Sequence, residues 1–186
     1  MRIVAGSAKG RRLAAPAGTG TRPTSDRIRE SIFDILGQRF DGGAVLDLFA
    51  GSGAMGLEAI SRGAERAVLV ERGREAAAIC EANAASLGFR DRVEVLRADA
   101  AGALRTLEGR GARFDLVFLD PPYAEGPGPT LELLGASGLL SPCARVVAEH
   151  ARRSPPGDSY ATLVRTDLRT FGEPAVSFYE REGAPT

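Results

Sequence analysis

The chain has few of the residues from which disulfide-linked, zinc-binding and membrane-spanning proteins are built. Its 186 residues include no tryptophan, two cysteines, Cys80 and Cys143, and one histidine, His150. Two cysteines do not make a disulfide framework, and one histidine without clustered ligands argues against a metal site. No apolar run approaches the roughly 20 residues of a transmembrane helix, and the N-terminus lacks the apolar region of a secretory signal. We therefore expect a cytoplasmic globular protein without a bound metal or a membrane partner.

The charges are balanced in number but unevenly distributed. The formal net charge is zero, from 24 basic and 24 acidic residues, yet residues 1–40 hold eight basic residues against three acidic ones. A basic segment interleaved with glycine suits contacts with phosphates, and thus an RNA partner. The alternative is an arm that is merely solvated. The candidate RNA-binding residues are Lys9, Arg11, Arg12, Arg22, Arg27 and Arg29.

Strand and helix patterns alternate through most of the chain. A helical pattern begins near Thr24 or Ser25 and ends near Gly37, and five strand–helix repeats follow from Ala44. Such alternation predicts an α/β fold, a Rossmann-like and mostly parallel sheet covered by helices. Residues 159–170 and 174–181 have no helix between them and should form a C-terminal antiparallel hairpin. We expect seven strands in all, with a small basic extension over residues 1–40 and the main domain over residues 41–186.

A glycine-rich turn follows the first predicted strand. Gly51, Gly53 and Gly56 in "DLFAGSGAMG" have the G-x-G-x-x-G spacing between a strand and a helix, and Glu71 comes twenty positions after Gly51. This is the spacing of a dinucleotide site, with the acid placed for ribose hydroxyls. Enzymes that bind NAD and enzymes that bind S-adenosylmethionine (SAM) both use such a turn, so the glycines alone leave the cofactor open.

Three acidic residues favour SAM. Asp47, Glu71 and Asp99 end the first three predicted strands, where open α/β sheets bind their ligands. A pyrophosphate is repelled by this negative charge, whereas SAM has no phosphate and carries an ammonium and a sulfonium group. Each acid taken alone could instead cap a helix or face solvent. The candidate cofactor-binding residues are Asp47, Phe49, Gly51, Ser52, Gly53, Glu71, Asp99 and Ala100.

The fourth predicted strand ends in "FLDPPY", which gives the candidate catalytic residues Asp120, Pro121, Pro122 and Tyr123. The two prolines remove two backbone donors and leave a group of acceptors beside an aromatic ring. A planar molecule with an amino group fits, because its N–H groups can donate to Asp120 and a proline carbonyl while its ring stacks on Tyr123. Held in this way, the nitrogen directs its lone pair at a methyl donor. A simple turn is the alternative.

These motifs resemble those of a known enzyme family. "DLFAGSGAMGLEAISRGA" and "FLDPPY" are similar to the class I SAM-dependent amino-methyltransferases. "RIVAGSAKGRRL", "TRPTSDRIRESIFDIL" and "VSFYER" resemble the bacterial 16S rRNA guanine-N2 methyltransferases over nearly the whole chain. The resemblance implies an enzyme that methylates N2 of one guanine in 30S subunits or their precursors. We also expect a monomer. Adenine-N6 methylation of DNA or RNA, NAD-dependent oxidoreduction and noncatalytic RNA binding are the alternatives.

Overall fold

The structure is a computed structural model that describes residues 1–15 and 23–182, with the backbone alone for residues 23–25. It divides into two compact units, Met1–Ala98 and Asp99–Thr186. The predicted boundary at residue 40, between a basic extension and the main domain, does not coincide with this division and stays a prediction. Among the described residues, no helix is long and apolar enough to cross a membrane. The predicted RNA contact Arg22 lies outside the described residues.

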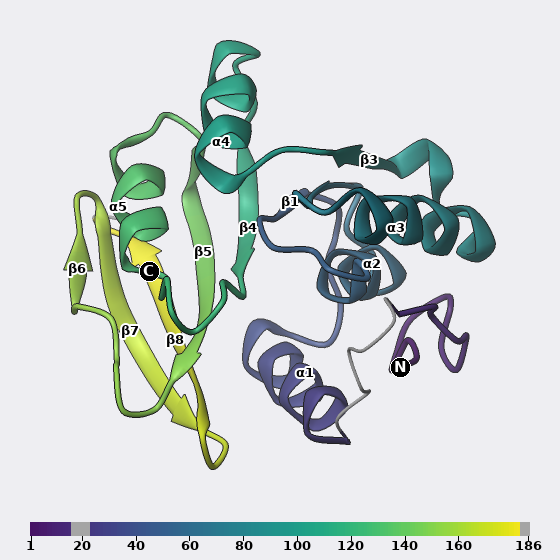
Figure 1. The fold of residues 1–186 in the computed structure, drawn as a ribbon, viewed down its shortest axis with the longest axis horizontal. Helices are drawn as coiled ribbons and strands as arrows, with labels where there is room; N and C mark the ends of the chain where they lie inside the picture. The colour runs from purple at the N-terminus through teal and green to yellow at the C-terminus, as the bar shows by residue number, and fades with distance from the viewer. Residues whose placement is uncertain (16–22, 183–186) are drawn as a thin grey trace. The chain divides into compact units, whose positions relative to one another are not determined.

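The first unit contains a three-stranded parallel sheet with the strand order β3-β2-β1 (Figure 1). All four β1 residues and four of the five in β2 are buried, as expected for a parallel sheet covered by helices. The helices match the predicted periodicity, and α1 begins with a proline, which suits the first helical turn. The elements are α1 (Pro23–Leu36), β1 (Ala44–Asp47), α2 (Ala54–Ser61), β2 (Arg66–Val70), α3 (Arg74–Leu87), the short 3-10 helix η1 (Arg90–Arg92) and β3 (Val93–Leu96).

The N-terminal residues are packed against α2. Backbone hydrogen bonds join Ile3 to Arg11 and to Gly10, and Ile3 is fully buried. Gly6 has a positive φ of 79°, and a Cβ there would lie 1.8 Å from the carbonyl oxygen of Ser61. Only glycine permits this close approach, so the basic segment is a folded part of the first unit over residues 1–15.

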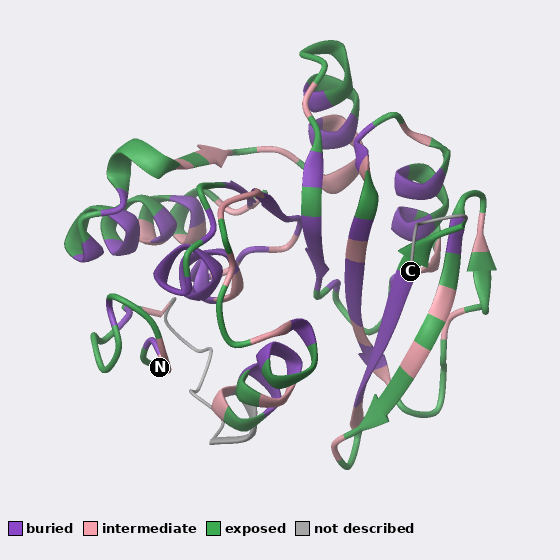
Figure 2. Cartoon of the chain, turned by 180° about the vertical axis from the view of Figure 1, so that it is seen from behind, coloured by how far each residue is buried: buried purple, intermediate pink, exposed green. Residues whose placement is uncertain are grey.

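The second unit contains a five-stranded mixed sheet with the order β4-β5-β8-β7-β6 (Figure 1). Strands β4 and β5 are parallel, whereas β8 pairs antiparallel with both β5 and β7. Strand β8 is mostly buried and β7 mostly exposed (Figure 2). The elements are α4 (Ala100–Gly109), β4 (Phe114–Leu119), α5 (Gly128–Ala136), β5 (Leu140–Ala151), β6 (Ser159–Tyr160), β7 (Leu163–Thr170) and β8 (Pro174–Arg181).

The described residues contain eight strands, one more than we predicted. The run expected as one strand over residues 159–170 bends at Ala161, which has a positive φ of 48°. This bend separates β6 from β7, and the two then pair with each other. A left-handed alanine gives no signal in the sequence, because that conformation is rare for residues with a Cβ.

Candidate active site

The glycine loop after β1 is held by Glu71. The Gly51 amide donates to Glu71 Oε2 over 3.0 Å, and the Gly73 amide donates to Oε1 over 2.7 Å. Gly51 and Gly53 have positive φ values of 55° and 80°, which favour glycine at both positions. Each carboxylate oxygen has a second lone pair. Glu71 can therefore shape the loop and still accept hydrogen bonds from a ribose, the predicted role.

The second and third glycines pack closely against the Leu69 side chain of β2. A Cβ at Gly53 would lie 2.9 Å from Leu69 Cδ1, and one at Gly56 would lie 2.3 Å from Leu69 Cδ2. The Gly56 amide donates to Asp47 Oδ2 over 3.2 Å, and Asp47 is only 3% exposed. Asp47 thus supports the first turn of α2. Its predicted contact with a cofactor cation stays a prediction.

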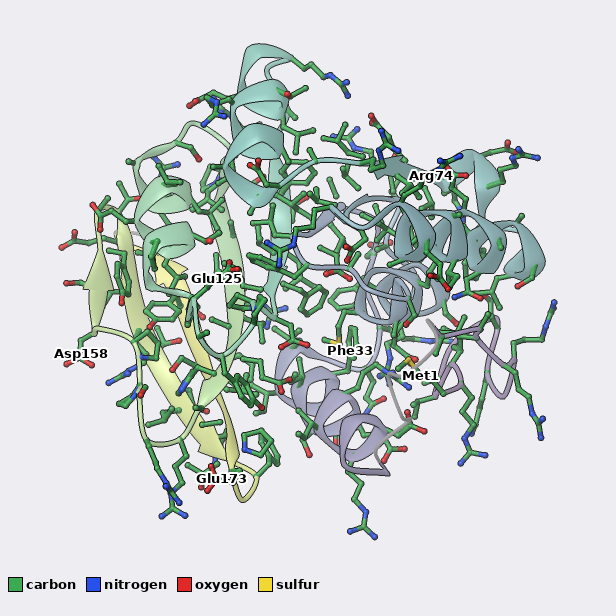
Figure 3. The ribbon with its side chains drawn as sticks, viewed as in Figure 1. Met1, Phe33, Arg74, Glu125, Asp158 and Glu173 are labelled. Carbon is green, nitrogen blue, oxygen red and sulfur yellow. The ribbon has the colours of Figure 1, made fainter. Side chains whose placement is uncertain are left out.

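Asn83 is a supporting residue that sequence reasoning missed. It is buried on α3, and its Nδ2 donates to the carbonyl of Ser52 over 2.9 Å and to that of Ala14 over 3.0 Å. Its Oδ1 accepts from the Ala14 amide over 2.9 Å. The Ser52 hydroxyl also donates to Met1 Sδ over 3.3 Å, at the terminus labelled in Figure 3. Asn83 therefore joins the basic N-terminal segment to the glycine loop.

Cys80 packs beneath the same loop. Its thiol donates to the Gly51 carbonyl over 3.2 Å. Burial, and then the negative charges of Asp47 and Glu71, raise the pKa of Cys80 to about 12. The sulfur therefore stays protonated at neutral pH and acts as a packing group rather than a nucleophile.

Asp99 begins the second unit and caps α4. Its Oδ1 accepts from the Gly102 amide over 2.7 Å, and its backbone is extended, as at other helix N-caps. Ala100, the other residue predicted here, is the first residue of α4. The helix-cap alternative for Asp99 is thus observed, while the contact with a cofactor stays a prediction for both residues.

The "DPPY" segment leaves the sheet directly after β4. Leu119 and Pro121 are buried, whereas Asp120, Pro122 and Tyr123 are exposed, with Tyr123 51% exposed. The amides of Glu125 and Gly126 donate to the Pro122 carbonyl and close a turn, on the loop marked by Glu125 in Figure 3. This turn does not use the Pro121 carbonyl. The loop therefore presents a carboxylate and an aromatic ring at the surface.

Asp120 is accessible to solvent and yet strongly desolvated. Burial raises the pKa of Asp120 to about 6, although the residue is exposed by surface area. Both hold for a carboxyl group that is recessed among protein atoms with one side open, because a recessed group keeps only part of its hydration. A carboxyl group with a pKa near neutrality can both accept and release a proton at physiological pH.

Glu149 is a second carboxyl group beside Asp120, and sequence reasoning missed it. It lies on β5, directly after Ala148, which pairs with Leu119. Burial and the negative charge of Asp120 raise the pKa of Glu149 to about 7, and a hydrogen bond from Tyr123 partly opposes this shift. The sequence signal that could have identified Glu149 is "AEH", which places an acid near the end of β5, the strand next to β4.

The predicted RNA-binding residues divide into two groups. Lys9, Arg11, Arg12 and Arg27 are exposed in the first unit, where a phosphate can reach them. Arg29 is only 3% exposed, pairs with Asp26 over 2.9 Å and lies 3.6 Å from Glu58, and it also donates to the Arg2 carbonyl. The structure thus contradicts the RNA role predicted for Arg29, because its charge is already used inside the protein.

His150 is a packing residue on β5. It is 2% exposed, and its Nε2 lies 2.9 Å from Ser177 Oγ. Burial lowers its pKa. The ring is therefore neutral at physiological pH and is held between β5 and β8.

Comparison with known proteins identifies the family. A family model described as "Conserved hypothetical protein 95" matches residues 1–180. The "Putative rRNA methyltransferase YlbH" of Bacillus subtilis (strain 168) is 42% identical over 184 residues, which cover 98% of this chain and 100% of that protein. The "Ribosomal RNA small subunit methyltransferase D" of Escherichia coli (strain K12) is 35% identical over 183 residues, covering 98% and 90%.

Solved structures confirm the predicted fold class. A hypothetical protein of Thermus thermophilus has a TM-score of 0.82 at 34% identity and covers 96% of this chain and 98% of its own. SMU.776, described as "a putative methyltransferase complexed with SAH", has a TM-score of 0.69 at 14% identity over 87% of this chain and 50% of its own, and it shows the fold alone. Together with the matches in sequence, these findings place the chain in the conserved hypothetical protein 95 family, to which it belongs as a homologue of ribosomal RNA small subunit methyltransferase D.

Proposed function

We propose that this protein transfers a methyl group from SAM to the exocyclic N2 of a guanine in 16S rRNA, in small ribosomal subunits or their assembly intermediates. The observation that carries the proposal is the loop directly after the parallel strand β4. This loop presents the Asp120 carboxylate and, three positions later, the Tyr123 ring. The name of the Bacillus subtilis relative supports methylation of rRNA, and the name of the Escherichia coli relative supports the small subunit. Guanine and its N2 position rest on the resemblance of the sequence motifs.

The residues of the loop suit methylation of an amino group. The two N–H groups of the substrate donate to Asp120 and to the Pro121 carbonyl, and the base stacks on Tyr123. The nitrogen lone pair then points away from the ring and toward the methyl donor. As the new N–C bond forms and the S–C bond of the donor breaks, the nitrogen becomes acidic. Asp120, with its pKa near 6, accepts the released proton and passes it to water.

The residues at the ends of the first three strands suit SAM as the cofactor. SAM supplies the methyl group when it is bound. Glu71 retains lone pairs for ribose hydroxyls, and the glycine loop brings the backbone close to a ligand without a side chain at Gly51. The acids at Asp47 and Asp99 add negative charge that suits a cationic ligand and repels a pyrophosphate. A titration with SAM and with NADH tests this choice, and binding of NADH alone would exclude it.

The substrate is tested by incubating the protein with labelled SAM and 30S subunits that lack their methyl groups. We expect label in the 16S rRNA, at N2 of one guanine, identified by nuclease digestion and mass spectrometry. Label on N6 of an adenine would instead support the alternative of an adenine methyltransferase, which can use the same loop. Absence of label from 30S subunits and from their precursors would contradict the proposal.

The exposed basic residues should contribute phosphate contacts. We expect the triple variant Arg11→Ala, Arg12→Ala, Arg27→Ala to bind 30S subunits more weakly and with a flatter salt dependence. Each lost phosphate contact lowers the magnitude of the slope of log K against log salt by about 0.7–0.9, so three contacts lower it by about 2–3. Filter binding between about 50 and 200 mM salt measures the slope.

A matched variant separates this effect from a general loss of positive charge. The triple variant Arg66→Ala, Arg90→Ala, Arg105→Ala removes the same charge from three other exposed positions. Its salt slope should equal that of the wild type. If the wild type and both triple variants had the same salt slope, the N-terminal arginines would be solvated charges that do not contact phosphates.

A further inference from the structure

Asp120 directly follows the last residue of β4, and Glu149 lies near the end of the neighbouring parallel strand β5. Phe118 pairs with Val147 and Leu119 with Ala148, so the next pair in this register is Asp120 and Glu149. Side chains alternate between the two faces of a sheet, and laterally paired residues point to the same face. With strands about 4.8 Å apart, the two carboxyl groups are direct neighbours.

Among the described residues, Asp120 and Tyr123 act on the charge of Glu149. On its other side β8 places Val176, which is fully buried, opposite Glu149. Two groups of the loop after β4 act on Glu149: the Tyr123 hydroxyl donates to its carboxylate, and the Asp120 carboxyl group, directly after Leu119, lies close enough to act on its charge. The adjacent His150 points to the opposite face, where it contacts Ser177. The groups that control the charge of Glu149 are therefore Asp120 and Tyr123.

An acid in this position is a poor choice for stability alone. A carboxyl group between Val176 and another carboxylate loses hydration and gains a like charge, so a leucine or valine would pack there at a lower cost. Carboxyl groups whose pKa values are raised by burial and by each other cluster at functional sites. The hydrogen bond from the half-exposed Tyr123 indicates that Glu149 orients the Tyr123 side chain.

We propose that Glu149 is a positioning residue for methyl transfer: its carboxylate anchors the Tyr123 hydroxyl, so that the ring stands in a fixed orientation beside Asp120. This inference rests on the proposed function, because it assigns the Tyr123 ring to the substrate base. Glu149 itself touches neither the base nor the methyl group. It acts by limiting the rotation of the ring on which the base stacks.

The pair ionises in two steps. Asp120 loses its proton first, with a pKa of about 6, and Glu149 follows with a pKa of about 7, because the charge of Asp120 opposes it. The first step creates the acceptor for the amino group. The second step strengthens the anchor, because a hydroxyl group donates more strongly to a charged carboxylate than to a neutral acid.

The first test compares kcat for Glu149→Ala, Glu149→Gln and Tyr123→Phe on 30S subunits. We expect Glu149→Ala to lower kcat about 10–100-fold with little change in KM, because the base is misaligned while the phosphate contacts stay. Glutamine keeps an acceptor oxygen and should restore part of kcat. The double variant Glu149→Ala, Tyr123→Phe should be no slower than the slower single variant. If the losses in kcat of the two single variants multiplied in the double variant, the two residues would act independently, and the proposal would be overturned.

The pH dependence of kcat is a readout that a merely structural role would not change. The wild type should gain activity in two steps, near pH 6 and near pH 7. Glu149→Gln and Tyr123→Phe should both lose the upper step and keep the lower one. Persistence of the upper step in either variant would overturn the proposal. Glu132→Ala, an exposed glutamate on α5, should keep both steps and serves as the matched control.

A measurement without substrate separates this inference from the proposed function. A free glutamate ionises near 4.5, so between about pH 4.5 and 7 the unfolded chain gains the charge of Glu149 before the folded protein does. The contribution of Glu149 to wild-type stability should fall over this range, and the Tm advantage of Glu149→Gln should grow by several degrees from pH 5 to pH 8. If the Tm difference between Glu149→Gln and the wild type stayed constant from pH 5 to pH 8, the proposed pairing of Glu149 with Asp120 would be overturned. A growing difference in a protein that methylates no RNA would overturn the proposed function alone.

Discussion

Asp120→Ala should lower the rate of methyl transfer by at least about 100-fold while the affinity for SAM stays within about threefold of the wild type. The carboxylate lies at the end of β4, on the loop that presents Tyr123, and it supplies both a hydrogen-bond acceptor and the proton acceptor of the proposed reaction. Losing a positioned acceptor or base costs about 10²–10⁴-fold. The proposed cofactor residues Gly51, Gly53 and Glu71 lie in the loops after β1 and β2 instead, so SAM binding should persist.

Single-turnover transfer of labelled methyl to 30S subunits measures the rate, and calorimetry measures the SAM affinity. Asp120→Asn gives an intermediate case, because its amide oxygen still accepts a hydrogen bond but cannot take up the proton. Asp91→Ala removes an exposed aspartate from η1 and should leave both quantities unchanged. A parallel loss of SAM affinity and transfer in Asp120→Ala would contradict its role toward the amino group.

The parts of the site that the sequence predicted are those encoded by adjacent residues. The glycine loop and the "DPPY" loop each lie within ten consecutive positions, and their turn and strand signals are local. Alternation of strands and helices is likewise a pattern of neighbouring residues, which is why the fold class was predicted correctly. The bend at Ala161 has no such signal, and β6 was therefore missed.

The parts that the sequence did not predict depend on contacts between distant residues. Glu149 is 29 positions from Asp120, and the two meet through the register of β4 and β5. In the sequence Asn83 is one polar residue in an alanine-rich helix, and its contacts with Ser52 and Ala14 follow from tertiary packing. Arg29 looked like its exposed neighbour Arg27, but its side chain lies on the face of α1 that meets Glu58.

The second prediction with a large expected effect concerns Glu58. Glu58→Ala should destabilise the protein by about 3–5 kcal/mol, the usual cost of breaking a buried ion pair from one side. Glu58 is fully buried on α2, accepts from Arg62 Nε over 2.8 Å and lies 3.6 Å from Arg29. Without it, two buried guanidinium groups lose a counter-charge. Arg29 Nε already lacks a hydrogen-bond partner among the described residues, so no spare acceptor is at hand.

Glu58 also holds the basic N-terminal segment. Its Oε2 accepts from the Val4 amide over 2.7 Å, and its Oε1 accepts from the Ala5 amide over 2.9 Å. Losing these bonds leaves two backbone donors unsatisfied and loosens the segment that carries Lys9, Arg11 and Arg12, whose remaining hydrogen bonds to α2 among the described residues are those with Ser61. Glu58→Ala should therefore weaken binding to 30S subunits even at temperatures where the protein remains folded.

Thermal unfolding and filter binding together test both consequences. At roughly 2–4 °C for each kcal/mol, the Tm of Glu58→Ala should fall by about 6–20 °C. Glu58→Gln should fall less, because its amide oxygen still accepts one of the bonds. Glu65→Ala, an exposed glutamate just after α2, should change neither Tm nor affinity. If Glu58→Ala unfolded at the temperature of Glu65→Ala, the ion pairs would contribute nothing. If it lost stability but bound 30S subunits normally, the exposed arginines would not need a fixed segment to reach the RNA.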